Sequence, residues 1–137
     1  MRTLPFTGLI LLGLIFITAC SSQTEQTSDG ISLHKGEKWP VNAEMKPHIQ
    51  QGKEILAEYQ SANDTDYKTL AEKLKKQNAD LISSCTMDGE SHNQLHNWLL
   101  PHMKLITKLK EAPNEQEAEQ VIMELEKSFE TYNKYFE

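Results

Sequence analysis

The sequence predicts an all-α fold, an antiparallel up-down-up-down four-helix bundle. Apolar side chains recur at intervals of three and four residues through most of residues 42–137, which is the spacing of one helix face. Glycine is scarce, at 6 of 137 residues, and no stretch alternates as a half-buried strand would. Short turns separate the four periodic segments, and short connections favour antiparallel neighbours. Helices of about 20 residues would give a bundle roughly 30 Å long.

The first two helices are predicted from residue 42 to about residue 59, and from residue 63 or 64 to residue 85. Asn42 is the expected N-cap of the first helix, and Asn63 or Asp64 that of the second. Pro47 falls in the first turns, where proline is tolerated. The predicted stripes are Met45, His48 or Ile49, Gly52, Leu56 and Tyr59 on the first helix, and Tyr67, Leu70, Leu74, Leu81 and Cys85 on the second.

The last two helices are predicted over residues 91–110 and 114–137. Ser91 with Gln94 fits a capping box at the start of the third helix, and Asn114 with Glu117 forms a second cap pair. Pro101 lies inside the third helix and should kink it. The predicted stripes are His92, Leu95 or His96, Leu99, Met103 and Ile106 on the third helix, and Val121, Ile122, Leu125, Phe129, Tyr132 and Phe136 on the fourth.

Residues 1–19 are typical of a secretion signal peptide. Arg2 precedes an apolar run that is too short to span a bilayer comfortably, and small residues follow directly before Cys20. The stretch ITAC resembles the bacterial lipobox, which implies cleavage before Cys20 and acylation (as by palmitate) of that cysteine. The chain would then be anchored in the membrane of the cell envelope. Ser21, in place of an aspartate, favours the outer membrane facing the periplasm.

The mature chain would consist of a tether and N-terminal segment, residues 20–41, and the bundle, residues 42–137. It would carry thirteen lysines against twenty acidic residues, a net charge of −7 with histidines neutral. This balance argues against a nucleic-acid partner. No motif of nucleophilic or hydrolytic catalysis is present, so we expect no enzyme. Cys85 would be a lone exported thiol, explained by metal ligation, an intermolecular disulfide or core packing.

The predicted topology brings sulfur and imidazole groups to one end of the bundle. The segment CTMDGESHNQLH, residues 85–96, connects the second and third helices, and the first helix begins at the same end. His92 and His96 are four residues apart and Met45 and His48 three, so each pair can share a helix face. We therefore predict a metal site with the candidate ligands Cys85, Met87, His92, His96, His48 and Met45.

The mixture of thiolate, thioether and imidazole favours copper, as Cu(I), over zinc, and over calcium or magnesium, which prefer oxygen ligands. Each residue also has a packing explanation: Cys85 as core, Met45 as a gap filler, and His92 as a solvent-facing residue of the helix start. His102 follows His92 by nearly three helical turns. We expect it to be a surface or supporting histidine rather than a ligand.

Two resemblances bear on these expectations. The segments KWPVN, residues 38–42, and CTMDGESHNQLHNWL, residues 85–99, resemble those of a family of small bacterial lipoproteins. That resemblance implies an exported helical domain but no particular activity. The bundle outline is similar to that of the cytochrome b562 family, which takes haem ligands from its first and fourth helices. The predicted fourth helix here has no histidine, so that haem ligation does not transfer.

Three functions fit the sequence. The first is a copper-binding lipoprotein for metal sequestration, sensing or delivery. The second is an electron carrier, with haem or with a copper centre of one cysteine, two histidines and a methionine. The third is a non-enzymatic interaction module that docks another envelope protein. On all three, the lysine-rich segments EKLKK and KLITKLK are interpreted as solvated helix surface.

Overall fold

The computed structural model describes residues 30–137. The predicted signal peptide and Cys20 lie outside the described residues, as do residues 21–29 of the predicted tether. Within residues 30–137 no helix is both long and apolar enough to cross a membrane. The described chain forms four α-helices and no strand: α1 (Lys46–Ser61), α2 (Tyr67–Ser83), α3 (Gly89–Glu111) and α4 (Glu115–Tyr135).

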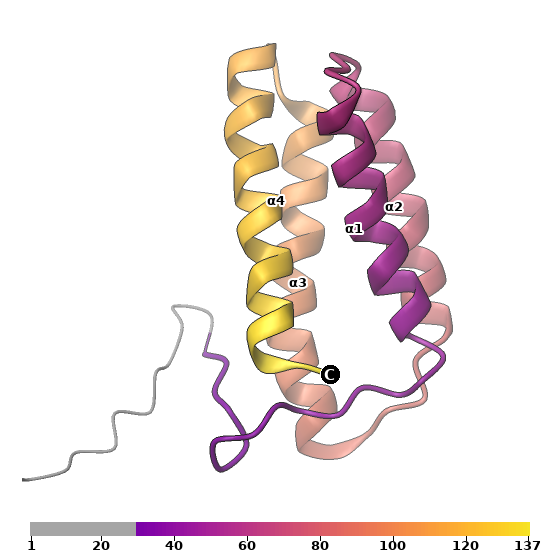
Figure 1. Ribbon diagram of the computed structural model, residues 1–137, viewed down its shortest axis with the longest axis vertical. Helices are drawn as coiled ribbons and strands as arrows, with labels where there is room; N and C mark the ends of the chain where they lie inside the picture. The colour runs from indigo at the N-terminus through magenta and orange to yellow at the C-terminus, as the bar shows by residue number, and fades with distance from the viewer. Residues whose placement is uncertain (1–29) are drawn as a thin grey trace, which may run out of the picture.

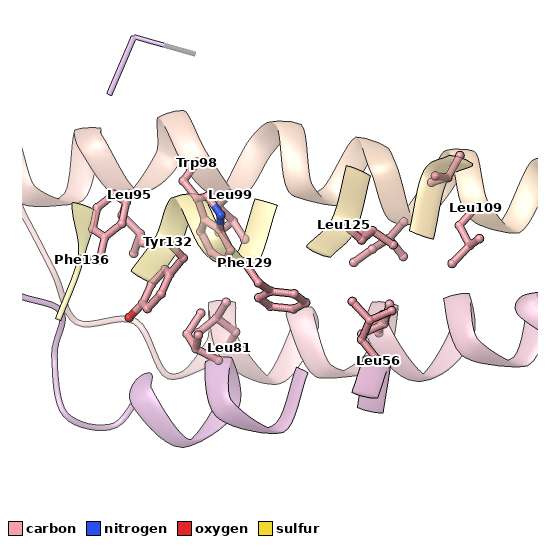
Figure 2. Close-up of a cluster of buried hydrophobic side chains, with 14 of the residues drawn as sticks. Leu56, Leu81, Leu95, Trp98, Leu99, Leu109, Leu125, Phe129, Tyr132 and Phe136 are labelled. Atoms are coloured by element: carbon pink, nitrogen blue, oxygen red, sulfur yellow. The ribbon is translucent and has the colours of Figure 1, made fainter. Parts of the chain in front are cut away.

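The four helices lie alongside one another and share one hydrophobic core (Figure 1). Consecutive helices pack together, α1 against α2, α2 against α3 and α3 against α4. Figure 2 shows buried side chains such as Leu56, Leu125 and Phe129 filling the space between the helices. These are the positions that helical spacing marks as apolar. The prediction of an all-helical, four-helix fold is confirmed.

The helices α1 and α4 approach each other closely at Gly52. A β-carbon at this position would lie 3.1 Å from Phe129 Cζ, so a larger residue would require the Phe129 ring to move by a few tenths of an ångström. On either side of this contact, Lys53 donates to the side-chain oxygen of Asn133, and Gln60 Nε2 donates to Glu126 Oε1 at 2.6 Å.

Side-chain caps begin α2 and α4. Asn114 caps α4 as predicted, because its Oδ1 accepts the backbone N–H of Glu117 at 2.9 Å. The predicted cap of α2 is wrong: Asp66, not Asn63 or Asp64, accepts the N–H of Thr69 at 3.0 Å. Asp64 instead accepts the N–H of Asp66 at 3.0 Å, which orders the turn before the helix.

The predicted caps of α1 and α3 are also wrong, because their side chains bond to distant segments. Asn42 Nδ2 donates to the carbonyl of Ser84 at 3.1 Å, and α1 begins later, at Lys46. Ser91 Oγ donates to the carbonyl of Pro40 at 2.6 Å, and α3 begins earlier, at Gly89. In both cases the side chain hydrogen-bonds to another segment of the chain instead of to the first turn of its own helix.

The N-terminal segment, residues 31–42, crosses one end of the bundle beside the end of the chain (Figure 1). The Trp39 N–H donates to the Tyr135 carbonyl at 2.8 Å, and the Glu137 N–H donates back to the Trp39 carbonyl at 3.0 Å. Ile31 is fully buried and Trp39 is buried. The segment is therefore part of the packed domain.

Candidate functional site

The first turns of α3 hold two histidines in contact. The rings of His92 and His96 lie edge to face, with centroids 4.4 Å apart. Their spacing of four residues places both side chains on one face of the helix. His92 is half-buried and His96 is exposed, and neither ring nitrogen is hydrogen-bonded to another residue of the described chain. Within residues 30–137, the ring nitrogens of the pair are therefore without a hydrogen-bond partner.

The connection between α2 and α3 carries the sulfur atoms. Cys85 is a free thiol, and both Cys85 and Met87 are half-buried against the edge of the hydrophobic core. The expectation that Cys85 lies on the second helix is wrong, because α2 ends at Ser83. The Cys85 N–H still donates to the Ile82 carbonyl at 3.2 Å, so the connection begins as a tight turn off the helix.

Asn42 holds this connection against the N-terminal segment. Its Nδ2 donates to the Ser84 carbonyl, and its Oδ1 accepts the N–H of Thr86 at 3.3 Å. The two bonds flank Cys85 on either side along the chain. A residue predicted as a helix cap thus positions a candidate ligand, which sequence spacing alone does not indicate.

The two candidates from α1 have different surroundings. Met45 is 1% exposed and packs in the core, immediately before the helix. His48 is half-buried and lies toward α2, where its backbone carbonyl accepts from the side-chain amide of Gln77. The Lys76 hydrogen bond is the main cause that lowers the pKa of Asp80 on α2, and the nearby His48 adds to this shift. His48 therefore lies near Asp80 of α2.

Within residues 30–137, no group of three or more His, Cys, Asp and Glu side chains stands ready to hold a metal ion. Among the candidate ligands in the described chain, His92 and His96 are the two whose side chains are found in contact. Cys85 and Met87 lie in the connection that leads into the same helix.

The interpretation of His102 as a surface histidine is wrong. This residue is 1% exposed, and its Nδ1 lies 2.8 Å from Ser128 Oγ. Its ring stacks on Trp98 with centroids 4.9 Å apart. Burial lowers the pKa of His102 to about 4, so the imidazole is neutral near pH 7. Its place between Leu99 and Ile106, at helical spacing, is the sequence signal that indicates a core position.

No family model matches this chain, and no curated protein or solved structure shows significant similarity to it. The resemblances to small bacterial lipoproteins and, in outline, to the cytochrome b562 family therefore stay predictions.

Proposed function

We propose that this chain is an exported lipoprotein that binds a soft transition metal, with copper preferred, at the end of the bundle where α3 begins. The observation that carries the proposal is the contact between the imidazoles of His92 and His96, 4.4 Å apart. A free cysteine and a methionine precede this pair by a few residues, in the connection from α2. Two imidazoles, a thiolate and a thioether form a donor set suited to Cu(I).

The sulfur donors complete the site in this proposal. Cys85 and Met87 are half-buried, so a moderate rotation of either side chain is enough to reach solvent or a bound ion. Metal binding releases the thiol proton of Cys85 and requires neutral imidazoles, so affinity falls on acidification. The roles of Met45 and His48 as further ligands stay predictions. Zinc and haem are the less favoured cofactors.

The proposed lipid anchor at Cys20 determines where in the cell this metal binding takes place. Acylation would hold the domain at the cell envelope, on the periplasmic side of the outer membrane, where it would serve metal sequestration, sensing or delivery. The acidic surface argues against nucleic acid as a partner. The function proposed is binding without catalysis.

We infer that the four helices run up-down-up-down. Trp39 bonds to Tyr135 and Asn42 bonds to Ser84, which supports the start of α1 lying beside the ends of α4 and α2. Tyr67 Oη donates to the Ala112 carbonyl at 3.1 Å, which supports the start of α2 lying beside the end of α3. This order gathers the candidate ligands at one end.

A competitive Cu(I) titration against a chromogenic chelator, under anaerobic reducing conditions, tests the metal proposal. We expect the lipid-anchored protein in detergent to bind one equivalent of Cu(I). The double change His92→Ala with His96→Ala should weaken binding at least about tenfold, and Cys85→Ser should also weaken it. His34→Ala is the matched control, because His34 is exposed on the N-terminal segment.

Unchanged affinity in the double variant would refute the proposed site. Visible absorption of the oxidised protein separates storage or delivery from electron transfer. A strong thiolate-to-Cu(II) band would favour the electron carrier with a Cys, two His and Met centre. A haem spectrum in the purified protein would favour the haem carrier instead.

A further inference from the structure

A groove of about 1010 Å³ lies between α2 and α3 and extends to the start of α4. Its volume is at the upper end of the range for sites that hold one small molecule. On α2 the lining positions include Lys75, Asn78 and Ile82, which are spaced along one helix face. The groove shares no residue with the proposed metal site.

Exposed apolar side chains gather in this groove. Ile82 is 45% exposed, Leu100 52% and Met103 37%, and all three line it. Among the described residues one further large hydrophobic side chain, Met123, is similarly exposed, and it lies outside the groove. Single exposed apolar residues need no explanation, but a contiguous group at a hollow indicates a binding surface.

Lysines surround the apolar part of the groove, although the chain as a whole is acidic. Lys75, Lys104, Lys108 and Lys110 line the groove, and two glutamates, Glu111 and Glu117, lie at its end near α4. Lys108 and Lys110 already pair with carboxylates. Lys104 has no ion pair or hydrogen bond with the rest of the described chain. A positive group is therefore free to bind an anion beside the apolar surface.

A buried amide in the groove lacks a partner. Asn78 is 7% exposed, and its Nδ2 makes no hydrogen bond within the described chain. An unpaired buried donor is unfavourable, and buried polar groups are normally satisfied by a protein group, water or ligand. In the proposed up-down order, α2 and α3 run antiparallel, and Glu72 on α2 forms an ion pair with Lys110 on α3. Asn78 follows Glu72 by six residues, and Lys104 precedes Lys110 by six residues. The donor and the free lysine thus lie at one level.

We propose that this groove binds a long-chain fatty acid. Asn78 Nδ2 is sealed from solvent, so the Asn78 side chain rotates toward the groove and the carboxylate then lies between this amide and Lys104 Nζ, while the hydrocarbon chain covers Ile82, Leu100 and Met103. A carboxylate supplies the acceptor that Asn78 lacks and the negative charge that Lys104 lacks. A slender ligand is required because the Asn78 amide is buried, and a partner helix, about 10 Å across, would rest on the rim.

Photo-crosslinking with hexadecanoate that carries a diazirine tests the proposal. The probe is added to the full lipid-anchored protein in nanodiscs of phosphatidylcholine, and crosslinked peptides are located by mass spectrometry. We expect the crosslinks at Ile82, Leu100 and Met103. Unlabelled hexadecanoate should compete, whereas hexadecanol, which has the same chain without the charge, should compete weakly.

Two variants sharpen this experiment. Lys104→Glu should lower the crosslinking yield about tenfold, because it replaces an attractive charge by a repulsive one. Lys127→Glu is the matched control, an exposed lysine of α4 outside the groove, and should leave the yield unchanged. Both changes are on the surface, so the fold is expected to persist.

Asn78→Leu distinguishes a ligand contact from a packing role. Removing the unpaired donor should raise the thermal midpoint, while the crosslinking yield falls. A residue that serves packing alone would not move these two measurements in opposite directions. Crosslinks spread equally to Met123, or a yield that Lys104→Glu does not change, would overturn the proposal. So would a partner protein that covers the groove and excludes the probe.

Discussion

The helix α3 carries three histidines in two contrasting environments. His92 and His96 lie in its first turns, partly or fully exposed, with their rings in contact. His102 lies further along the same helix, in the core, with burial lowering its pKa to about 4. The residue type is the same, but burial decides what each ring can do: an accessible ring nitrogen is open to solvent or a ligand, whereas the buried ring serves packing.

The neighbours of each histidine explain the contrast. His102 stacks on Trp98 and meets Phe129 edge to face at 4.7 Å, and its ring nitrogen is paired with Ser128. These contacts exclude water from the ring, and the loss of hydration disfavours its charged form. His96 lies six residues before His102, about 120° around the helix, so it faces away from the core, and the nitrogens of His92 and His96 are left for solvent or a ligand.

The largest expected effect comes from removing the aromatic support of the buried histidine. Trp98 is 2% exposed, its Nε1 donates to the Ser128 carbonyl at 2.7 Å, and its ring covers His102. Trp98→Ala should lower the free energy of unfolding by about 3–5 kcal/mol, measured by urea denaturation. Leu100→Ala, at an exposed position of the same helix, is the control. Equal losses in the two variants would contradict the assignment of Trp98 to the core.

Acidification should destabilise the protein through His102. The pKa is about 4 in the folded state and about 6.5 in the unfolded chain, so the unfolded state binds more protons between these values. Stability should therefore fall as the pH is lowered from about 6.5 to about 4, by up to about 3 kcal/mol. His102→Gln should remove this part of the slope in urea denaturation at several pH values. An identical slope in both proteins would show that other groups cause it.

A smaller effect is expected at the connection that carries Cys85. Asn42→Ala removes both hydrogen bonds to Ser84 and Thr86, and should cost about 1–2 kcal/mol of unfolding free energy. It should also speed alkylation of Cys85 by iodoacetamide, because the flanking backbone is released. The exposed neighbour Ala43, changed to Ser, is the control. An unchanged alkylation rate would mean that Asn42 does not position the thiol.

The smallest effect on stability is expected at the exposed histidine pair. Alanine at both His92 and His96 should change the unfolding free energy by less than about 0.5 kcal/mol, measured without metal. The same change is expected to weaken Cu(I) binding, so stability and binding separate at this site. If the double variant instead lost several kcal/mol of unfolding free energy, His92 and His96 would be packing residues, as His102 is.

The elements that could be predicted from sequence are those set by local spacing. The four helices follow from apolar residues at intervals of three and four, and Asn114 caps α4 because its partner Glu117 is three residues away. The caps that failed, at Asn42 and Ser91, bond to residues far away in the sequence. Local propensity cannot anticipate such partners, since the contacts exist only after the elements pack.

The candidate sites also differ in whether local spacing or tertiary packing creates them. The pairing of His92 with His96 follows from their spacing on one helix. The lysine-rich segments, by contrast, are indistinguishable in sequence from ordinary solvated helix surface. Only the packing of α2 against α3 brings Lys75 and Lys104 to the same groove. The unpaired amide of Asn78 is equally invisible in sequence, because a missing hydrogen bond is a property of the packed chain.

The sequence by itself determined the helical class, the number of helices, and the residues available for chemistry, because these depend on periodicity and composition. The tertiary structure alone decided that the Asn78 amide is buried without a partner in the described chain, and that Asn42 bonds across the bundle end rather than capping a helix. Burial and long-range hydrogen bonds depend on which faces meet when the helices pack, and residues far apart in the chain determine that together.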